Sequence, residues 1–151
     1  MYKIFLLLLF LFINTKTIAQ DNNKELEKVT NCIENYFYGY IERDINKLNS
    51  AFDTLHGTMK APGGNNDGTE AYKNLFFKDL LPKWGNRAKL SQSELADTEL
   101  KILNIDIHDS QMAIGKISMR VGNTTYIDVL SLQKLNGMWK ITNKMFLTYK
   151  E

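Results

Sequence analysis

The sequence has 151 residues, with 19 lysines and arginines against 17 acidic residues and a formal net charge of +2, so its length suits a single domain with a core. Acids and bases are interspersed, which argues against a basic surface for nucleic acid and against a basic amphipathic helix for a membrane surface. Cys32 is the only cysteine, so no intrachain disulfide is expected. We interpret it as a small buried apolar residue of a helix, with a reactive thiol as the alternative.

Residues 1–19 have the pattern of a secretory signal peptide. Lys3 precedes an uninterrupted apolar run from Ile4 to Ile13, and Ala19 lies where signal peptidase reads small side chains. The run is too short to cross a bilayer core, which needs about 20 residues. We expect cleavage after Ala19, a secreted or periplasmic protein without a membrane span, and one domain over residues 20–151. An uncleaved anchor is the alternative.

The first half of the expected mature chain has the period of helices. Apolar residues at three- and four-residue steps predict a long amphipathic helix over residues 25–41. Asp44 can cap a second, short helix with Leu48 and Phe52 inward. The composition of residues 60–68, KAPGGNNDG, predicts a loop. Thr69 can then cap a third helix that ends near Pro82 and has an apolar stripe of Tyr72, Leu75, Phe76 and Leu80.

From residue 95 onward apolar and polar residues alternate, which predicts a four-stranded antiparallel meander over residues 95–107, 111–121, 124–135 and 138–149. Two-residue turns are expected at Gly122-Asn123 and Asn136-Gly137, and a three-residue turn at residues 108–110. The second of these turns pairs Leu130 with Asn143 and Asp128 with Met145. The turns agree in placing one apolar face inward, which includes Leu103, Ile105, Ile107, Ile117, Met119, Asp128, Leu130, Trp139, Ile141, Asn143, Met145 and Leu147.

The opposite face carries polar residues, among them Lys140 and Lys144. Five apolar residues interrupt it, and we expect them to form a homodimer interface: Met112, Ile114, Ile127, Val129 and Phe146. Helices that precede a sheet with one apolar face must cover that face. The predicted fold is therefore α+β, with a curved antiparallel sheet, four-stranded with or without a short extra strand, wrapped around a long N-terminal helix and two shorter helices.

Two segments, YFYGYIERDINKLNSAF near the start and YIDVLSLQKLNGMWKITNKMF at the end, resemble the putative lumazine-binding proteins of the nuclear transport factor 2-like (cystatin-like) superfamily. The resemblance covers essentially the whole expected mature chain. It implies a cone-shaped sheet closed by helices, usually dimeric, with a pocket at the wide end. It does not imply one activity, because the superfamily includes isomerases, cyclases, dehydratases and binding proteins.

Asp128 is the most informative candidate site residue, because an ionised carboxylate on an apolar inner face needs a partner. It could serve as a general base or ligand anchor, or it could brace the fold by bonding to Asn143, a tyrosine hydroxyl or backbone amides. Tyr36 and Tyr40 lie four residues apart on one helix side and could present hydroxyls to a pocket; an aromatic core is the alternative. Trp84 could lie at the cone mouth and stack on a flat ligand.

The remaining residues expected around a ligand are Ile117, Leu130, Asn143 and Met145. His56 and His108 lack the spacing of a metal site, and neither a phosphate-binding loop nor a nucleophile motif is present in the sequence, so we expect neither metal nor cofactor.

These features favour an exported small-molecule-binding domain with an apolar pocket for an aromatic or polycyclic compound. An isomerase- or cyclase-like enzyme, with Asp128 as general base and Tyr40 as a hydroxyl donor, is the first alternative. A non-catalytic dimer that binds a protein partner is the second.

The export prediction is tested by the intact mass of the protein recovered from its native host. The mass should correspond to a chain that begins at Gln20. A species that retains residues 1–19 would contradict the prediction.

Overall fold

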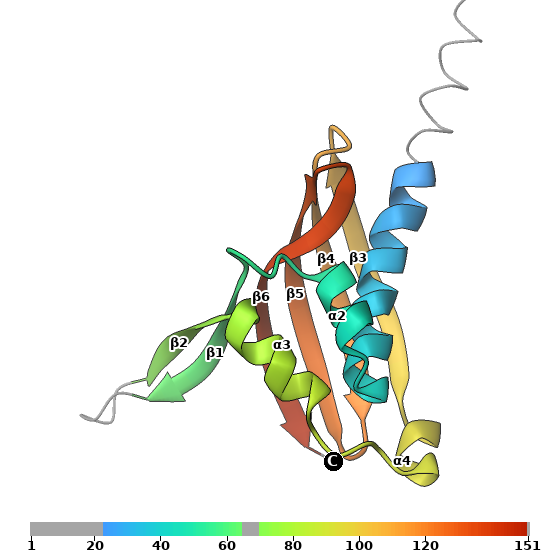
Figure 1. Cartoon of the computed structure of the whole chain (residues 1–151), viewed down its shortest axis with the longest axis vertical. Coiled ribbons are helices and arrows are strands. Elements are labelled where there is room, and N and C mark those ends of the chain that lie inside the picture. The colour runs from blue at the N-terminus through green and yellow to red at the C-terminus, as the bar shows by residue number, and fades with distance from the viewer. Residues whose placement is uncertain (1–22, 65–69, 151) are drawn as a thin grey trace, which may run out of the picture.

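The computed structural model describes residues 23–64 and 70–150, so the predicted signal peptide lies outside the described residues. The α+β class is confirmed, and one sheet holds six strands in the order β2-β1-β6-β5-β4-β3 (Figure 1). A first helix (residues 23–42) is followed by α2 (Ile45–Ala51), β1 (Thr58–Gly64), β2 (Glu70–Phe76), α3 (Phe77–Gly85), α4 (Gln92–Ala96), β3 (Glu99–His108), β4 (Met112–Val121), β5 (Thr124–Leu135) and β6 (Met138–Lys150).

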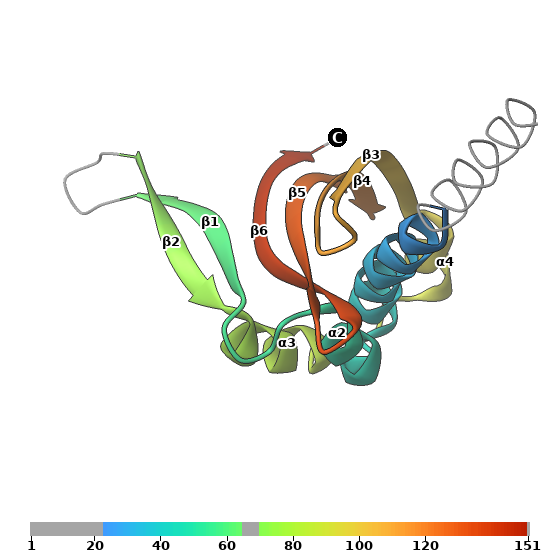
Figure 2. The ribbon, with the colours of Figure 1, turned by 90° about the horizontal axis from the view of Figure 1, so that it is seen from above.

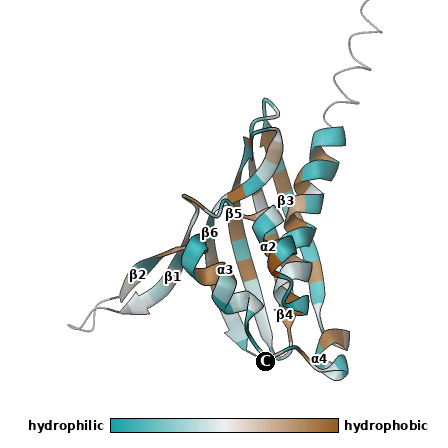
Figure 3. Ribbon diagram, viewed as in Figure 1, coloured by the Kyte–Doolittle hydropathy of each residue, from teal (hydrophilic) through white to brown (hydrophobic). Residues whose placement is uncertain are grey.

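The sheet is strongly curved and does not close, and the first helix, α2 and α3 lie on one side of it (Figures 1 and 2). Apolar and polar residues alternate along its strands, as expected for a sheet with one covered face (Figure 3). The core between the layers includes Ile33 of the first helix, Leu48 of α2 and Ile117 of β4, none of which is exposed. Asp44 caps α2 as predicted, accepting hydrogen bonds from the amides of Asn46 and Lys47 at 2.8 and 3.2 Å.

The two predicted two-residue turns are confirmed. Asn136 and Gly137 have φ angles of 51° and 80°, the left-handed values that this dipeptide tolerates, and Leu135 pairs with Met138 across them. Val121 pairs with Thr124 across Gly122-Asn123. The remaining turn lies one residue later than predicted, because His108 pairs with Met112 and the loop is therefore residues 109–111.

A β-bulge in β6 overturns part of the predicted register. Ser131 pairs with Asn143 whereas its neighbour Leu132 pairs with Ile141, so Thr142 is an extra residue. Beyond the bulge the alternation is inverted. Lys144 and Phe146 turn to the inner face in place of the predicted Asn143, Met145 and Leu147, and the last two are 50% and 54% exposed on the outer face.

A second bulge, between Ile102 and Asn104 of β3, has a similar local effect. It leaves Leu103 as the extra residue, and this side chain is 49% exposed rather than inward as predicted. Ile105 and Ile107 still pair with the inward Gly115 and Ala113, so their predicted face is confirmed.

Within the segment predicted as a loop and a third helix, residues 60–64 belong to β1 and residues 70–76 form β2, and α3 follows them. Residues 65–69, with the predicted cap Thr69, lie outside the described residues. β1 pairs in parallel with β6 over only three residues, and the β1–β2 hairpin then extends away from the other four strands as an arm (Figure 2). Pairing with β6 overrides the loop-like composition of β1, a common outcome for strand propensity. The spacing of Tyr72, Leu75 and Phe76 suited a helix, but these residues are in β2, and Pro82 lies inside α3 rather than at its end.

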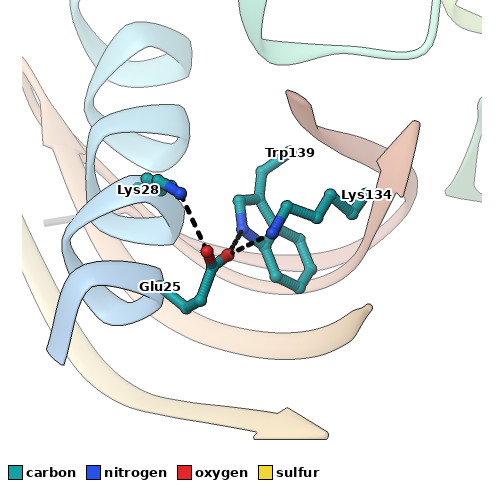
Figure 4. A network of polar contacts seen from close by, with 4 residues as sticks. All are labelled: Glu25, Lys28, Lys134 and Trp139. Carbon is teal, nitrogen blue, oxygen red and sulfur yellow. Dashed lines mark hydrogen bonds and ion pairs between the residues drawn. The ribbon is translucent and has the colours of Figure 1, made fainter. Parts of the chain in front are cut away.

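A buried glutamate ties the start of the first helix to the β5–β6 hairpin (Figure 4). Glu25 accepts hydrogen bonds from Trp139 Nε1 at 2.7 Å, Lys134 Nζ at 2.8 Å and Lys28 Nζ at 2.8 Å. The two lysines and the indole lower the pKa of Glu25 to about 2, with the hydrogen bond from Lys134 as the largest cause. This cluster therefore anchors the helix at the end of the sheet opposite the cavity described below.

Glu25→Ala should lower the free energy of unfolding by about 1–3 kcal/mol, because the buried indole N–H of Trp139 loses its acceptor. Glu25→Gln should cost less, since its amide oxygen can still accept from Trp139. Urea unfolding measures both, with the exposed Glu27→Ala on the same helix as the control. A Glu25→Ala protein as stable as the control would contradict the assignment.

The same carboxylate predicts a pH dependence. Because the folded-state pKa of Glu25 lies below its unfolded value, its stabilising contribution is present above about pH 5 and is lost as the pH falls through about 2. The stability difference between wild type and Glu25→Gln should therefore shrink over this range in urea titrations. A constant difference would show that the carboxylate is not held by the two lysines.

Candidate functional site

A cavity of about 320 Å³ opens between the first helix, α3 and the sheet, beside the beginning of β5 and the last part of β6. Its inner end is buried, whereas Arg87 and Thr148 at its outer end are exposed. Met59 of β1 and Met119 of β4 complete its apolar lining. Five aromatic side chains form much of the wall: Tyr36, Tyr40, Trp84, Tyr126 and Phe146.

The aromatic wall is built from close ring contacts that connect the helices to the sheet. The rings of Tyr36 and Trp84 stack with an interplanar angle of 28° and a centroid distance of 6.2 Å. Tyr40 meets Trp84 edge to face at 5.5 Å and Tyr126 at 6.4 Å. Such contacts fix the rings in place, so the cavity has a rigid aromatic lining.

Three buried polar groups meet at the inner end of the cavity. Tyr36 Oη donates to Asp128 Oδ2 at 2.9 Å, and Lys144 Nζ donates to Tyr36 Oη at 2.9 Å. Lys144 Nζ also forms an ion pair with Asp128 Oδ2. Asp128 is 0% exposed and Lys144 3%, so this pair is removed from water. The first helix, β5 and β6 each contribute one member.

Burial shapes the protonation of this cluster. It raises the pKa of Tyr36 well above its ordinary value, and the neighbouring charge of Asp128 raises it further. Tyr36 is therefore a neutral phenol that donates a hydrogen bond to the carboxylate. Burial also lowers the pKa of Lys144, while the ion pair with Asp128 opposes that shift. The ion-pair contact with Asp128 Oδ2 supports the ammonium form of Lys144.

Asp128 is held at an energetic cost. Its Oδ1 atom is buried and has no hydrogen-bond partner among the described residues. An unpartnered buried carboxylate oxygen is costly, and a buried ion pair rarely stabilises a fold more than apolar residues of similar size. Such a cluster beside a cavity is a candidate for function rather than for stability.

The exposed end of the cavity has a second polar group. Arg87, which follows α3, donates from Nη1 to Tyr40 Oη at 2.7 Å, and its guanidinium lies 5.6 Å from the centroid of the Tyr40 ring. Burial, followed by the nearby Tyr40, raises the pKa of Tyr126 to about 12. Tyr126 is therefore a neutral phenol at this end, next to the Arg87–Tyr40 hydrogen bond.

The structure brings together three predicted site residues, Tyr36, Tyr40 and Trp84, which line the cavity. Asp128 lies behind Tyr36 and Lys144 and is not part of the lining. Of the three bracing partners considered for it, the structure shows a tyrosine hydroxyl, that of Tyr36. Ile117 and Leu130 are fully buried core residues that do not line it.

The predicted placement of Asn143 and Met145 beside Asp128 is wrong, because the bulge at Thr142 turns them away. Asn143 Nδ2 donates to Thr58 Oγ1 of β1 at 2.9 Å, and Met145 lies in a hollow on the outer face. Lys144 and Arg87 also line the cavity but were not among the predicted site residues. A carboxylate on an apolar face needs a cation as its partner, and this requirement was the only feature of the sequence that could have pointed to Lys144.

The other reactive residue types have structural surroundings. Cys32 is buried, its Sγ lies 3.3 Å from the carbonyl oxygens of Ala51 and Trp139, and burial raises its thiol pKa to about 12, as expected for an unreactive core cysteine. The described residues contain no group of three His, Cys, Asp or Glu side chains suited to a metal. Across the same residues, we find no helix with the length and apolar character of a membrane span.

Removing one member of the buried ion pair should destabilise the protein far more than removing both. Lys144→Met leaves an uncompensated carboxylate and should cost about 3–5 kcal/mol, whereas Asp128→Asn/Lys144→Met should be near neutral or stabilising. Urea unfolding of both variants and of the exposed control Lys116→Met measures the difference. A double variant as unstable as Lys144→Met would show that the pair is kept for stability.

Comparisons with known proteins agree with this architecture. A nuclear transport factor 2-like protein of unknown function from Shewanella baltica is 20% identical, with a TM-score of 0.67 over 85% of this chain and 96% of that chain. One from Silicibacter pomeroyi is 14% identical, with a TM-score of 0.67 over 85% and 98%. A putative scytalone dehydratase from Novosphingobium aromaticivorans is 13% identical, with a TM-score of 0.59 over 88% and 91%.

At these identities the solved structures establish the fold, which is the nuclear transport factor 2-like cone. No curated protein matches the sequence. The family model described as putative lumazine-binding matches residues 24–147, which is most of the chain. The chain therefore belongs to the putative lumazine-binding family.

Proposed function

We propose that this chain is a small-molecule-binding domain and that its ligand is a flat aromatic compound held in the cavity of about 320 Å³. The observation that carries the proposal is the lining of five aromatic side chains around a buried polar end. Ligand pockets generally measure about 300–1,000 Å³, so this one suits a compound of one or two fused rings. The family description, putative lumazine-binding, supports a compound of this kind.

An isomerase- or cyclase-like enzyme is the alternative, and the solved structure named as a putative scytalone dehydratase keeps it open. The geometry favours a binding protein. A general base must reach the substrate, but Tyr36 and Lys144 line the cavity while Asp128 does not. The hydroxyl hydrogen of Tyr36 is already donated to Asp128, so Tyr36 is a poor oxyanion donor, and Tyr40, the donor of the enzyme alternative, bonds to Arg87 at the exposed end.

Lumazine, a flat bicyclic dione, should bind to the wild-type protein in isothermal titration calorimetry. Thr148→Trp places a large ring in the exposed end of the cavity and should weaken binding by on the order of tenfold or more, since it fills the space that the ligand needs. Thr148→Ser keeps the space and is the matched control. Equal affinity for Thr148→Trp and Thr148→Ser would place the ligand elsewhere.

We also propose that the domain acts outside the cytoplasm, supported by the signal-peptide pattern of residues 1–19, and that it forms a homodimer through the outer face of its sheet. Apolar side chains on this face are about half exposed, including Ile114 at 54%, Met145 at 50% and Leu147 at 54%. Phe146 was predicted there as well, but the bulge turns it inward. A face of this character is typical of an interface between protein copies.

Light scattering at tens of micromolar protein should therefore report a dimer. Ile114→Lys/Leu147→Lys should convert it to a monomer, because two charges would be buried at the centre of the interface. Leu55→Lys, at an apolar residue that is 73% exposed and lies outside the sheet, is the control and should remain dimeric. A wild-type monomer would contradict the proposal, and a dimeric double variant would place the interface on another surface.

A further inference from the structure

We propose that the cavity selects flat aromatic compounds that carry an anionic oxygen, with Lys144 as the anchor at the buried end and Arg87 as a second contact at the exposed end. This inference rests on the proposed function and adds the chemical class of the ligand. It also assigns the direct ligand contact to Lys144 and makes Asp128 a positioning residue that acts through it.

The charged side chains of the described cavity wall are all positive. Of the residues that line the cavity, two are cations, Lys144 and Arg87, and none of those described is an aspartate or glutamate. The carboxylate of Asp128 lies behind this wall, in contact with Tyr36 and Lys144. The wall therefore offers positive charge and hydrogen-bond donors to a ligand, which complements a carboxylate, phenolate or enolate.

Lys144 has one unused N–H donor for such an oxygen. An ammonium group has three N–H donors, and the contacts to Asp128 and Tyr36 use two of them. The group is held in position by aromatic rings, since Lys144 Nζ lies 4.8 Å from the ring centroid of Phe146 and 5.2 Å from that of Tyr36. Because Lys144 is 3% exposed and lines the cavity, its third donor is available to a ligand rather than to bulk water.

Asp128 explains why this cation can be kept in an apolar place. Burying an unpaired ammonium is costly, so Lys144 requires a counterion. Asp128 supplies the negative charge through a single oxygen, Oδ2, which also accepts a hydrogen bond from the Tyr36 hydroxyl. The carboxylate thus fixes the direction of both cavity-lining groups without itself lining the cavity.

Arg87 adds a donor at the other end. Its Nη1 atom bonds to Tyr40 Oη, which orients the guanidinium beside the cavity, and the planar group has further N–H donors that suit an anionic oxygen. Arg87 is exposed, so its contribution is screened by water and should be smaller than that of Lys144. The two cations define an axis along which a compound of one or two rings can lie against Trp84.

The test uses two probes of the same shape and different charge, naphthalene-2-carboxylate and naphthalene-2-carboxamide, in isothermal titration calorimetry at neutral pH. The wild-type protein should bind the carboxylate on the order of tenfold or more tightly than the amide. Asp128→Asn/Lys144→Met, which removes the anchor without leaving a lone buried charge, should lose most of this preference and still bind the amide. Arg87→Gln should lose a smaller part.

The control Lys83→Gln removes one positive charge, as Arg87→Gln does, but at an exposed residue of α3 outside the cavity. It should bind both probes as the wild type does. Equal binding of the two probes by the wild type would overturn charge selection and leave aromatic binding intact. A preference that survives in Asp128→Asn/Lys144→Met would overturn the role of Lys144. If neither probe binds and lumazine does not bind either, the proposed function itself fails.

Discussion

The buried ion pair between Asp128 and Lys144 is the interaction on which the character of the cavity depends. Both groups are removed from water, and desolvation makes each of them unfavourable without the other. Tyr36 completes the cluster by accepting from the lysine and donating to the carboxylate. The first helix, β5 and β6 are thereby joined at one point, which is the closed end of an otherwise aromatic cavity.

This pair can form because β6 contains one extra residue. A regular strand after Ile141 would send Asn143 inward and Lys144 to solvent. The bulge at Thr142 reverses this order, and it also directs Asn143 toward Thr58, where β1 begins its short parallel pairing with β6. One irregularity therefore places the cavity cation and helps to attach the β1–β2 arm.

Sequence reasoning predicted the parts of the fold that local chemistry determines. The Asn136-Gly137 and Gly122-Asn123 turns, the Asp44 cap and the inward residues of β4, β5 and the first part of β6 up to Ile141 all follow from short-range preferences. The predictions were wrong where contacts between distant parts of the chain determine the secondary structure. KAPGGNNDG has the composition of a loop, yet pairing with β6 and β2 makes part of it a strand. The spacing of apolar residues in β2 and α3 suited one helix as well as it suited a strand followed by a helix.

The same division holds for the candidate site. Tyr36 and Tyr40 were identifiable from helix spacing, Asp128 from the cost of an acid on an apolar face, and Trp84 from its place between Pro82 and Gly85. The position of Lys144 depends on a bulge, and alternation alone does not reveal a bulge. Two features of the structure, the unpartnered Asp128 Oδ1 and the absence of acids from the described cavity lining, support our proposal that this cluster serves ligand binding rather than stability.

A crystal structure of the protein soaked with naphthalene-2-carboxylate tests this account most directly. The account predicts Lys144 on the inner face beyond a bulge at Thr142, with a carboxylate oxygen of the probe within hydrogen-bond distance of Lys144 Nζ and the rings beside Trp84. A regular β6 with Lys144 in solvent, or a probe bound away from Lys144, would contradict it.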